Sequence, residues 1–489
     1  MGVPYASIII PTHDRHSTLP YAVHSALSQT VRDIEVVVVG DGCTREVRAV
    51  AEGLAAEDPR VRFLDRPKAS QRGAANRDFA VRTALALRIF YNDDDDLLMP
   101  RHVELLGAAL DRCDIVDTPV ASVGTEGRVA LGLHASGHPL QRRLLADGRF
   151  KGVFDTHLAH RKEAYIARAG WTGARDREDV VLHMLKGFAA AGELRWTTLD
   201  RISALSLHGV RRLGMSAQRR ARELAHWSKD LSDSTMEAAL RARGGYCFHA
   251  LRLVDATRGA PARARRGLLQ AVGLPPSMAA EAASGGRWRR LRALPLPRLP
   301  RAEPEEGRIP FSREQRAALE AVFSLARGIR PDPKGAGRAL DELLQPVLGP
   351  FFHVDRLIDR FARLLGPARV SALLDGLSTC TALPLARFHL AVHQRSVGES
   401  DRRAVRFGFE TAPPESRFFF GLSVVDGLIR LGDPAAAWDW AEELAPLAPA
   451  SRHAVRFWEV RRSLATDAGR GDQAALAAER IAELTPSPV

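Results

Sequence analysis

The chain carries at residues 85–96 the stretch LALRIFYNDDDD, an apolar run that ends in four consecutive aspartates, Asp93 to Asp96. Carboxylates packed this closely repel one another, and burial at a strand end adds a desolvation cost. A divalent cation turns the repulsion into attraction, because Mg²⁺ and Mn²⁺ prefer hard oxygen ligands. Taken alone, the run is more typical of a solvated acidic loop, so its meaning depends on the residues around it.

Upstream of the aspartates, short apolar runs alternate with amphipathic segments. The runs predict strands, and the segments between them predict helices. We expect strands at 6–10 (ended by Pro11), 34–39, 61–64 and 85–91, and helices at 17–27, 45–56 and 73–85. This alternation indicates a parallel α/β sheet, in which ligands bind beyond the carboxyl ends of the strands. Pro11, Thr12, Asp41 and the four aspartates stand at such ends, so we expect them to converge.

The composition is that of an ordinary folded protein of two or three domains, with 489 residues, 45% hydrophobic and 26% charged. The net charge of +12 lies mostly on arginine, without an aromatic-interleaved basic stripe, so no nucleic-acid partner is predicted. Four cysteines stand far apart, which favours a reducing compartment. No uninterrupted apolar stretch of about 20 residues and no secretory signal occur, so a cytoplasmic location is predicted.

The pattern divides the chain into four parts. We expect an α/β domain, a helical extension, a linker rich in proline and arginine, and an all-helical domain, at residues 1–225, 226–286, 287–310 and 311–489. In the last part, LGDPAA from Leu431 and RGDQAA from Arg470 both open a small-residue helix. This similarity is typical of tetratricopeptide-type repeats, and a generic helical bundle is the alternative.

Several short motifs follow one another in the first 215 residues. They are SIIIPTHDR at 7–15, SALSQT at 25–30, EVVVVGDGCT at 35–44, GAAN at 73–76, NDDDDLLMP at 92–100, AGW at 169–171 and REDVVL at 177–182. In order and separation they resemble the inverting family 2 glycosyltransferases. The resemblance implies a GT-A fold, the Rossmann-like α/β fold of nucleotide-diphospho-sugar transferases, followed here by an all-α region.

The resemblance implies a metal and a nucleotide-sugar donor. A bound Mn²⁺ or Mg²⁺ would stabilise the charge that grows on the leaving diphosphate. The family's DXD element maps onto Asp93, Asp94 and Asp95, and a register shifted by one residue is the alternative. Asp95 would be the direct metal ligand with Asp93 and His208 beside it, and Asp93 or Asp94 would make ribose or water-mediated contacts. Asp96 then remains as a cap for the following helix.

The same resemblance places the nucleotide. Residues of four motifs are expected to bind the nucleotide sugar: Pro11, Thr12, Asp14, Arg15, Asp41, Asn76, Asp93 and Asp94. Asp41 would accept a hydrogen bond from a uracil-type ring, although an Asp-Gly turn would also explain it. The family usually has two acids before this glycine and a serine after it. This chain has Gly40-Asp41 and Cys43, so UDP is only mildly favoured over dTDP or GDP.

An inverting transfer needs a base for the acceptor's proton, and a carboxylate is the usual solution. The resemblance assigns this role to Asp179, with Glu178 positioning the substrate or the base. A pair of acids at a helix N-terminus is the alternative. Trp171 would either stack on an acceptor sugar or pack in the core.

The sequence thus predicts a metal-dependent inverting glycosyltransferase acting on a glycan, a lipid-linked acceptor or a protein or peptide. Through the helical region it could also contact the inner face of a membrane peripherally or form a homo-oligomer. The alternative is a non-catalytic helical scaffold with a degenerate GT-A domain.

Overall fold

The computed structural model describes residues 2–124, 129–168, 170–173, 179–207, 215–231, 236–243, 259–272, 354–375, 382–412, 414–448 and 454–484, and a few single positions between 253 and 279. Glu178, His208 and the predicted linker at 287–310 lie outside these residues. The described part forms two compact units, an N-terminal α/β unit and a C-terminal helical unit. The predicted division into four parts stays a prediction, although residue 225 lies within a helix, α8 (Ala217–Asp230).

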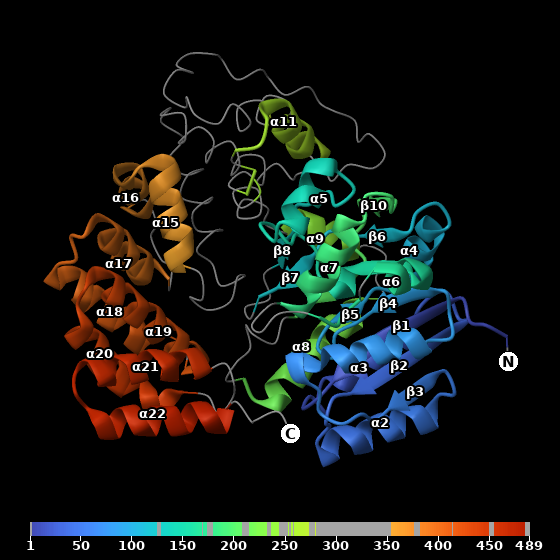
Figure 1. The fold of residues 1–489 in the computed structure, drawn as a ribbon, viewed down its shortest axis with the longest axis horizontal. Helices are drawn as coiled ribbons and strands as arrows, with labels where there is room; N and C mark the ends of the chain where they lie inside the picture. The colour runs from blue at the N-terminus through green and yellow to red at the C-terminus, as the bar shows by residue number, and fades with distance from the viewer. Residues whose placement is uncertain are drawn as a thin grey trace. The chain divides into compact units, whose positions relative to one another are not determined.

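The main sheet of the described α/β unit has seven strands in the order β10-β6-β9-β4-β1-β2-β3. Figure 1 shows β1 to β3 side by side at the blue end of the chain. The strands are β1 (Ala6–Thr12), β2 (Ile34–Gly40), β3 (Val61–Leu64), β4 (Arg88–Tyr91), β6 (Ile115–Asp117), β9 (Leu158–Arg161) and β10 (Trp196–Thr198). A second sheet, in the order β5-β11-β7-β8, is built from β5 (Leu97–Leu98), β7 (Ala121–Val123), β8 (Val129–Leu131) and β11 (Ala204–Ser206).

Helices cover both faces of the main sheet. Side chains of α1, α2 and α4 share one buried cluster with the strands, and those of α3, α6 and α7 share the other. The helices of this unit are α1 (Leu19–Leu27), α2 (Arg45–Glu57), α3 (Ser70–Thr83), α4 (His102–Leu110), α5 (Pro139–Ala146), α6 (Lys162–Arg168), α7 (Val180–Ala190), α8, α9 (Met236–Arg243) and α11 (Ala262–Ala271), with a short 3-10 turn at Asp155–His157.

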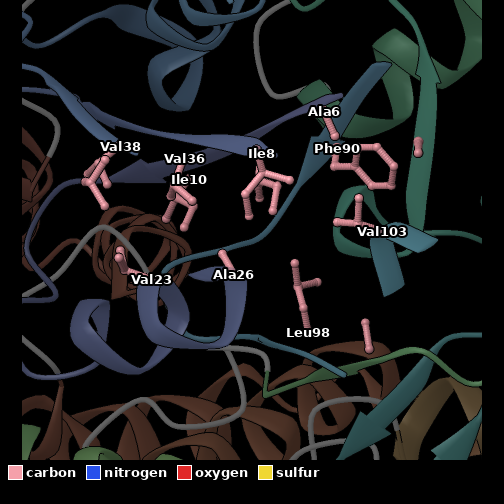
Figure 2. Packing of buried hydrophobic residues seen from close by; sticks show 14 of the residues in the cluster. Ala6, Ile8, Ile10, Val23, Ala26, Val36, Val38, Phe90, Leu98 and Val103 are labelled. Atoms are coloured by element: carbon pink, nitrogen blue, oxygen red, sulfur yellow. The ribbon is translucent and has the colours of Figure 1, made fainter. Parts of the chain in front are cut away.

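The alternation of side chains along β1 and β2 builds these two clusters. Ile8 and Ile10 of β1 pack over Val23 and Ala26 of α1, as Figure 2 shows. Ile9 points to the opposite face, toward α3 and α7. Because both faces are buried, the strands are continuously apolar rather than alternating, as expected for parallel strands inside a sheet.

The described residues of the helical unit form helices that pack mainly against their neighbours in sequence. They are α15 (Val354–Leu365), α16 (Pro367–Asp375), α17 (Leu383–Gln394), α18 (Glu399–Thr411), α19 (Pro414–Leu431), α20 (Pro434–Leu444), α21 (Val455–Asp467) and α22 (Gly471–Leu484). The two similar stretches correspond to α20, which Asp433 caps, and to α22. The tetratricopeptide-like character stays a prediction. None of the described helices is long and apolar enough to cross a membrane.

The predicted fold class, an α/β domain followed by an all-α region, is confirmed, and three details differ. First, the sheet is mixed, because β9 runs antiparallel to both β4 and β6. Second, β1 continues through Pro11 to Thr12, where these residues pair in register with Val39 and Gly40 of β2. Third, β4 begins at Arg88, since Leu85 and Leu87 are more than half exposed.

Candidate functional site

Three neighbouring strands deliver the predicted site residues to one edge of the main sheet. Strands β4, β1 and β2 are adjacent and parallel, so their carboxyl ends meet. Thr12 ends β1, Asp41 follows β2, and the aspartate run follows β4. The contacts between these segments define a candidate site on the α/β unit.

Asp94 and Asp95 are drawn together by one arginine. The Nη1 atom of Arg15 lies 2.7 Å from Asp94 Oδ1 and 2.7 Å from Asp95 Oδ1. The hydroxyl of Thr12 donates to Asp94 Oδ2 at 2.8 Å. Burial alone would lower the pKa of Arg15, but Asp95 and Asp94 raise it above its usual value. Thr12 and Arg15 therefore hold the aspartate run in place, and any contact with a nucleotide would be additional.

A second arginine comes from a distant helix. Arg220 of α8 places Nη2 2.9 Å from Asp95 Oδ2. Both oxygens of Asp95 therefore accept from a guanidinium, and the Asp95 side chain is only 4% exposed. The two arginines neutralise the carboxylate that the resemblance assigns to the metal.

Asp96 has a different set of partners. Its Oδ2 accepts hydrogen bonds from the hydroxyls of Thr156 (2.7 Å) and Ser206 (2.9 Å), and its Oδ1 accepts from the amide of Leu207 (2.7 Å). Burial and the neighbouring Asp95 raise the pKa of Asp96 to about 8 despite these donors. The expectation that Asp96 caps the following helix is wrong, because β5 follows directly and α4 begins only at His102. Asp96 instead ties the aspartate run to two distant segments.

Asp93 faces another buried acid that the sequence analysis missed. Burial, together with the carboxylates of Asp155 and Asp96, raises the pKa of Asp93 well above its usual value. Burial also raises the pKa of Asp155, although Arg77 and Lys151 oppose the shift. Asp155 thus lies between the aspartate run and the group around Asp179.

The carboxylate of Asp41 is held by the chain itself. Its Oδ1 accepts from the amide of Ala69 and the side chain of Asn76, both at 2.8 Å, and its Oδ2 pairs with Lys68 at 2.7 Å. A carboxylate offers about four lone-pair positions, so a further acceptor position remains on Oδ2. Asn76 is buried and also donates to the carbonyl of Pro67, which makes it a support for Asp41 rather than an evident ligand contact.

A strained turn presses against Asp41. Gln71, Arg72 and Gly73 have φ of 51°, 56° and 78°, three consecutive left-handed residues at the start of α3. A Cβ atom at Gly73 would lie 2.8 Å from Asp41 Cγ. The glycine in the GAAN motif therefore serves a close approach as well as a positive φ.

The other two predicted nucleotide contacts occupy different surroundings. Pro11 is buried within β1, and Asp14 is exposed in the loop that follows. The structure places neither side chain in a polar contact with the aspartate run among the described residues. Their assigned roles stay predictions.

Asp179 opens helix α7 and pairs with a lysine. Its Oδ1 accepts from the amides of Val181 (3.0 Å) and Leu182 (3.1 Å), as an N-cap does. Lys151 Nζ lies 3.0 Å from Oδ2, and Lys151 also lies over the ring of Phe154 at 4.6 Å. Burial alone would raise the pKa of Asp179, but Lys151 and the amide donors lower it below its usual value. The carboxylate is ionised at neutral pH, and its Oδ2 carries fewer donors than Oδ1.

The position of Trp171 decides between the two predicted roles, stacking on an acceptor sugar and packing in the core. Its side chain is fully buried and packs edge-on against Tyr91, with ring centroids 5.5 Å apart. It belongs to the core on the α3–α7 face, so it cannot stack on a sugar in this arrangement.

The aspartate run offers two carboxylates to a divalent cation. Mg²⁺ is usually held by one or two carboxylates together with substrate phosphates, rather than by a complete protein cage. Asp94 and Asp95 supply such oxygens on a single loop and already share one cationic partner. Within the described part of the chain no cluster of three or more His, Cys, Asp or Glu side chains suits a metal, and the predicted ligand His208 lies outside it.

Comparison with known proteins identifies the domain. The sequence profile described as "Glycosyl transferase family 2" matches residues 7–165. These residues form a family 2 glycosyltransferase domain. Hyaluronan synthase of Pasteurella multocida is 39% identical to the chain over 103 residues, which are 21% of this chain and 10% of the relative. Chondroitin synthase of Escherichia coli is 37% identical over 103 residues, or 15% of its length. The chain therefore spans only a small part of these relatives.

The solved structures that the chain resembles are less similar in sequence. S. aureus TarS 1–349 in complex with UDP-GlcNAc has 15% identity and a TM-score of 0.34, covering 57% of this chain and 87% of that one. The mannosyltransferase PcManGT from Pyrobaculum calidifontis, in complex with GDP-Man and Mn²⁺, has 14% identity and a TM-score of 0.33, covering 58% and 74%.

Four residues of this site carry no motif of their own. Lys68, Lys151, Asp155 and Thr156 reach the candidate site from loops whose positions depend on tertiary packing. Arg220 belongs to a run of arginines in which the sequence does not distinguish a buried member from a solvated one. Only its spacing on α8 separates it from its exposed neighbours.

Proposed function

We propose that the chain is a metal-dependent inverting glycosyltransferase that uses a nucleotide-sugar donor, with a UDP-sugar favoured. The observation that carries the proposal is the position of Thr12, Asp41 and the pair Asp94 and Asp95 at the carboxyl ends of three adjacent strands of a family 2 domain. Asp41 keeps an acceptor position for a ring N–H. Asp94 and Asp95 would hold the cation, which when bound supplies a Lewis acid for the leaving diphosphate.

The chain's own residues would perform a single displacement. The acceptor hydroxyl attacks the anomeric carbon, the bond from that carbon to the phosphate oxygen breaks, and the nucleoside diphosphate leaves. The proton of the hydroxyl goes to Oδ2 of Asp179, the carboxylate oxygen contacted by fewer donors. An ionised carboxylate in a partly exposed position suits this role, because the acceptor must reach it.

A donor screen tests the proposal. We expect UDP-sugars with Mn²⁺ to raise the melting temperature of the full chain by roughly 5–10 °C at a concentration of about 100 times Kd, and UDP release to follow when an acceptor is added. GDP- and dTDP-sugars, each with and without Mn²⁺, are the matched comparisons. A full chain that neither binds any nucleotide sugar nor releases nucleotide would favour the scaffold alternative.

Lys151 should set the pH at which the proposed base works. With its pKa lowered, Asp179 stays ionised until the pH falls through that value, so wild-type activity is lost only in acid. In Lys151→Met the attraction of the lysine is gone, Asp155 remains nearby, and the weaker attraction of Arg72 is kept. We expect the acid limb of the kcat/KM profile to move up by roughly one pH unit.

The exposed cation Arg143 on α5 provides a control for the Lys151 experiment. Arg143→Met removes one positive charge from the same domain without touching Asp179. An unshifted acid limb in Lys151→Met, or an equal shift in both variants, would contradict the assigned role of the ion pair.

The proposal also covers the acceptor, the role of the helical unit and the location of the protein. A glycan, a lipid-linked acceptor or a protein or peptide each offers the required hydroxyl. The helical unit would supply acceptor recruitment, homo-oligomer formation or peripheral membrane contact, and the location is proposed to be cytoplasmic.

A further inference from the structure

Arg220 reaches the glycosyltransferase site from outside the matched family region. It lies on α8, 125 residues after Asp95, whereas the family profile ends at residue 165. Its side chain is 16% exposed and ends on Asp95 Oδ2, while Arg15 takes Oδ1. Both sides of the carboxylate proposed to hold the cation are thus occupied by guanidinium groups.

A cation and two guanidinium groups cannot share one carboxylate comfortably. Like charges at hydrogen-bond distance repel strongly in a buried setting, where the effective dielectric constant is low. One arginine must therefore withdraw when a divalent cation binds Asp95. Arg15 bridges Asp94 and Asp95, so its departure would break two ion pairs. Arg220 approaches on a long side chain from a separate helix, so it can leave without disturbing the loop.

We propose that Arg220 is a built-in counter-ion of Asp95 that yields its place to the divalent cation and then binds the diphosphate of the donor. This inference rests on the proposed function. Two carboxylates already neutralise one divalent cation, so the negative charge of a bound nucleoside diphosphate is left unbalanced. A guanidinium group matches phosphate oxygens in geometry and charge. The guanidinium group of Arg220, once displaced, would therefore bind phosphate oxygens next to Asp95.

The two halves of this exchange predict effects of opposite sign. In Arg220→Ala, the competitor for Asp95 is absent, so Mn²⁺ should bind the nucleotide-free protein about tenfold more tightly. With Mn²⁺ saturating, UDP should bind the same variant about tenfold more weakly, because one charge-assisted contact to phosphate is lost. General damage to the site would weaken both.

Direct binding measurements on the full chain separate these cases. Free Mn²⁺ is followed by electron paramagnetic resonance without nucleotide, and UDP binding by calorimetry at saturating Mn²⁺. Arg222→Ala removes an exposed arginine from the same helix and should change neither constant by more than about twofold. Thermal melts of each variant establish that the fold is kept.

The outcomes are distinct. The exchange is supported if Arg220→Ala binds Mn²⁺ more tightly and UDP more weakly, while Arg222→Ala changes neither affinity. If Arg220→Ala leaves both dissociation constants unchanged, or binds both Mn²⁺ and UDP more weakly, the exchange is overturned. A wild type that binds UDP but no Mn²⁺ also overturns it while leaving nucleotide-sugar use intact. A wild type that binds no nucleotide contradicts the proposed function itself.

Discussion

Asp179→Asn should lower the transfer rate roughly 10²- to 10⁴-fold while UDP binding stays near the wild-type value. The amide is isosteric with the carboxylate but cannot accept the proton of the acceptor hydroxyl. Asparagine is also a good helix N-cap, so its side-chain oxygen can keep the bonds from Val181 and Leu182. The loss should therefore be chemical rather than structural.

Steady-state transfer and calorimetric UDP binding, measured on the same preparation, check the Asp179 prediction. The exposed Asp147 at the end of α5 supplies a control, since Asp147→Asn makes the same chemical change far from any proposed role. Transfer at the wild-type rate in Asp179→Asn would remove this residue from the mechanism. A parallel loss of UDP binding would instead indicate that the cap and the Lys151 pair mainly shape the site.

Asp95→Asn is expected to abolish Mn²⁺-dependent UDP binding and to lower turnover by at least roughly 10²-fold. A neutral amide is a poor ligand for a hard cation, and it also leaves the facing guanidinium groups of Arg15 and Arg220 without a carboxylate at this position. Because a broken buried ion pair destabilises the fold as well, the melting temperature should fall. Both effects come from the same carboxylate.

Comparison with Asp93→Asn decides which aspartate acts on the metal. Asp93 is proposed to contribute less, because its carboxylate is half-buried near Asp155 rather than held between the two arginines. We expect Asp93→Asn to retain measurable Mn²⁺-dependent UDP binding in the same titration. The reverse order of effects would move the direct ligand from Asp95 to Asp93.

The sheet was predictable because its strands are buried on both faces. Runs such as ASIII at 6–10 and EVVVVG at 35–40 are rich in β-branched side chains that favour buried strands, so most of β1 and of β2 follows from local pattern. The antiparallel β9 was not predictable in the same way. Its residues LAHR lack a long apolar run, and its place between β4 and β6 depends on pairing with both.

The candidate site was predictable in outline but not in its internal contacts. Their positions at strand ends predicted that Thr12, Asp41 and the aspartates would lie at the same edge of the main sheet. Sequence spacing carries no information on which donor each carboxylate meets, since those donors arrive from loops and from α8. For the same reason the hydrogen bond from Asn76 to Asp41 and the anchoring contacts of Asp96 were not predicted.

The contacts of Asp96 and Asp95 determine where an expression fragment of this domain can end. Asp96 accepts hydrogen bonds from residues 156, 206 and 207, and its neighbour Asp95 is paired with residue 220. An expression fragment trimmed to the matched family region would strip a buried acid of two of its three donors. A fragment that keeps all three donors of Asp96 must therefore include Leu207, and one that also keeps Arg220 beside Asp95 must include α8, well past the limits that family similarity alone suggests.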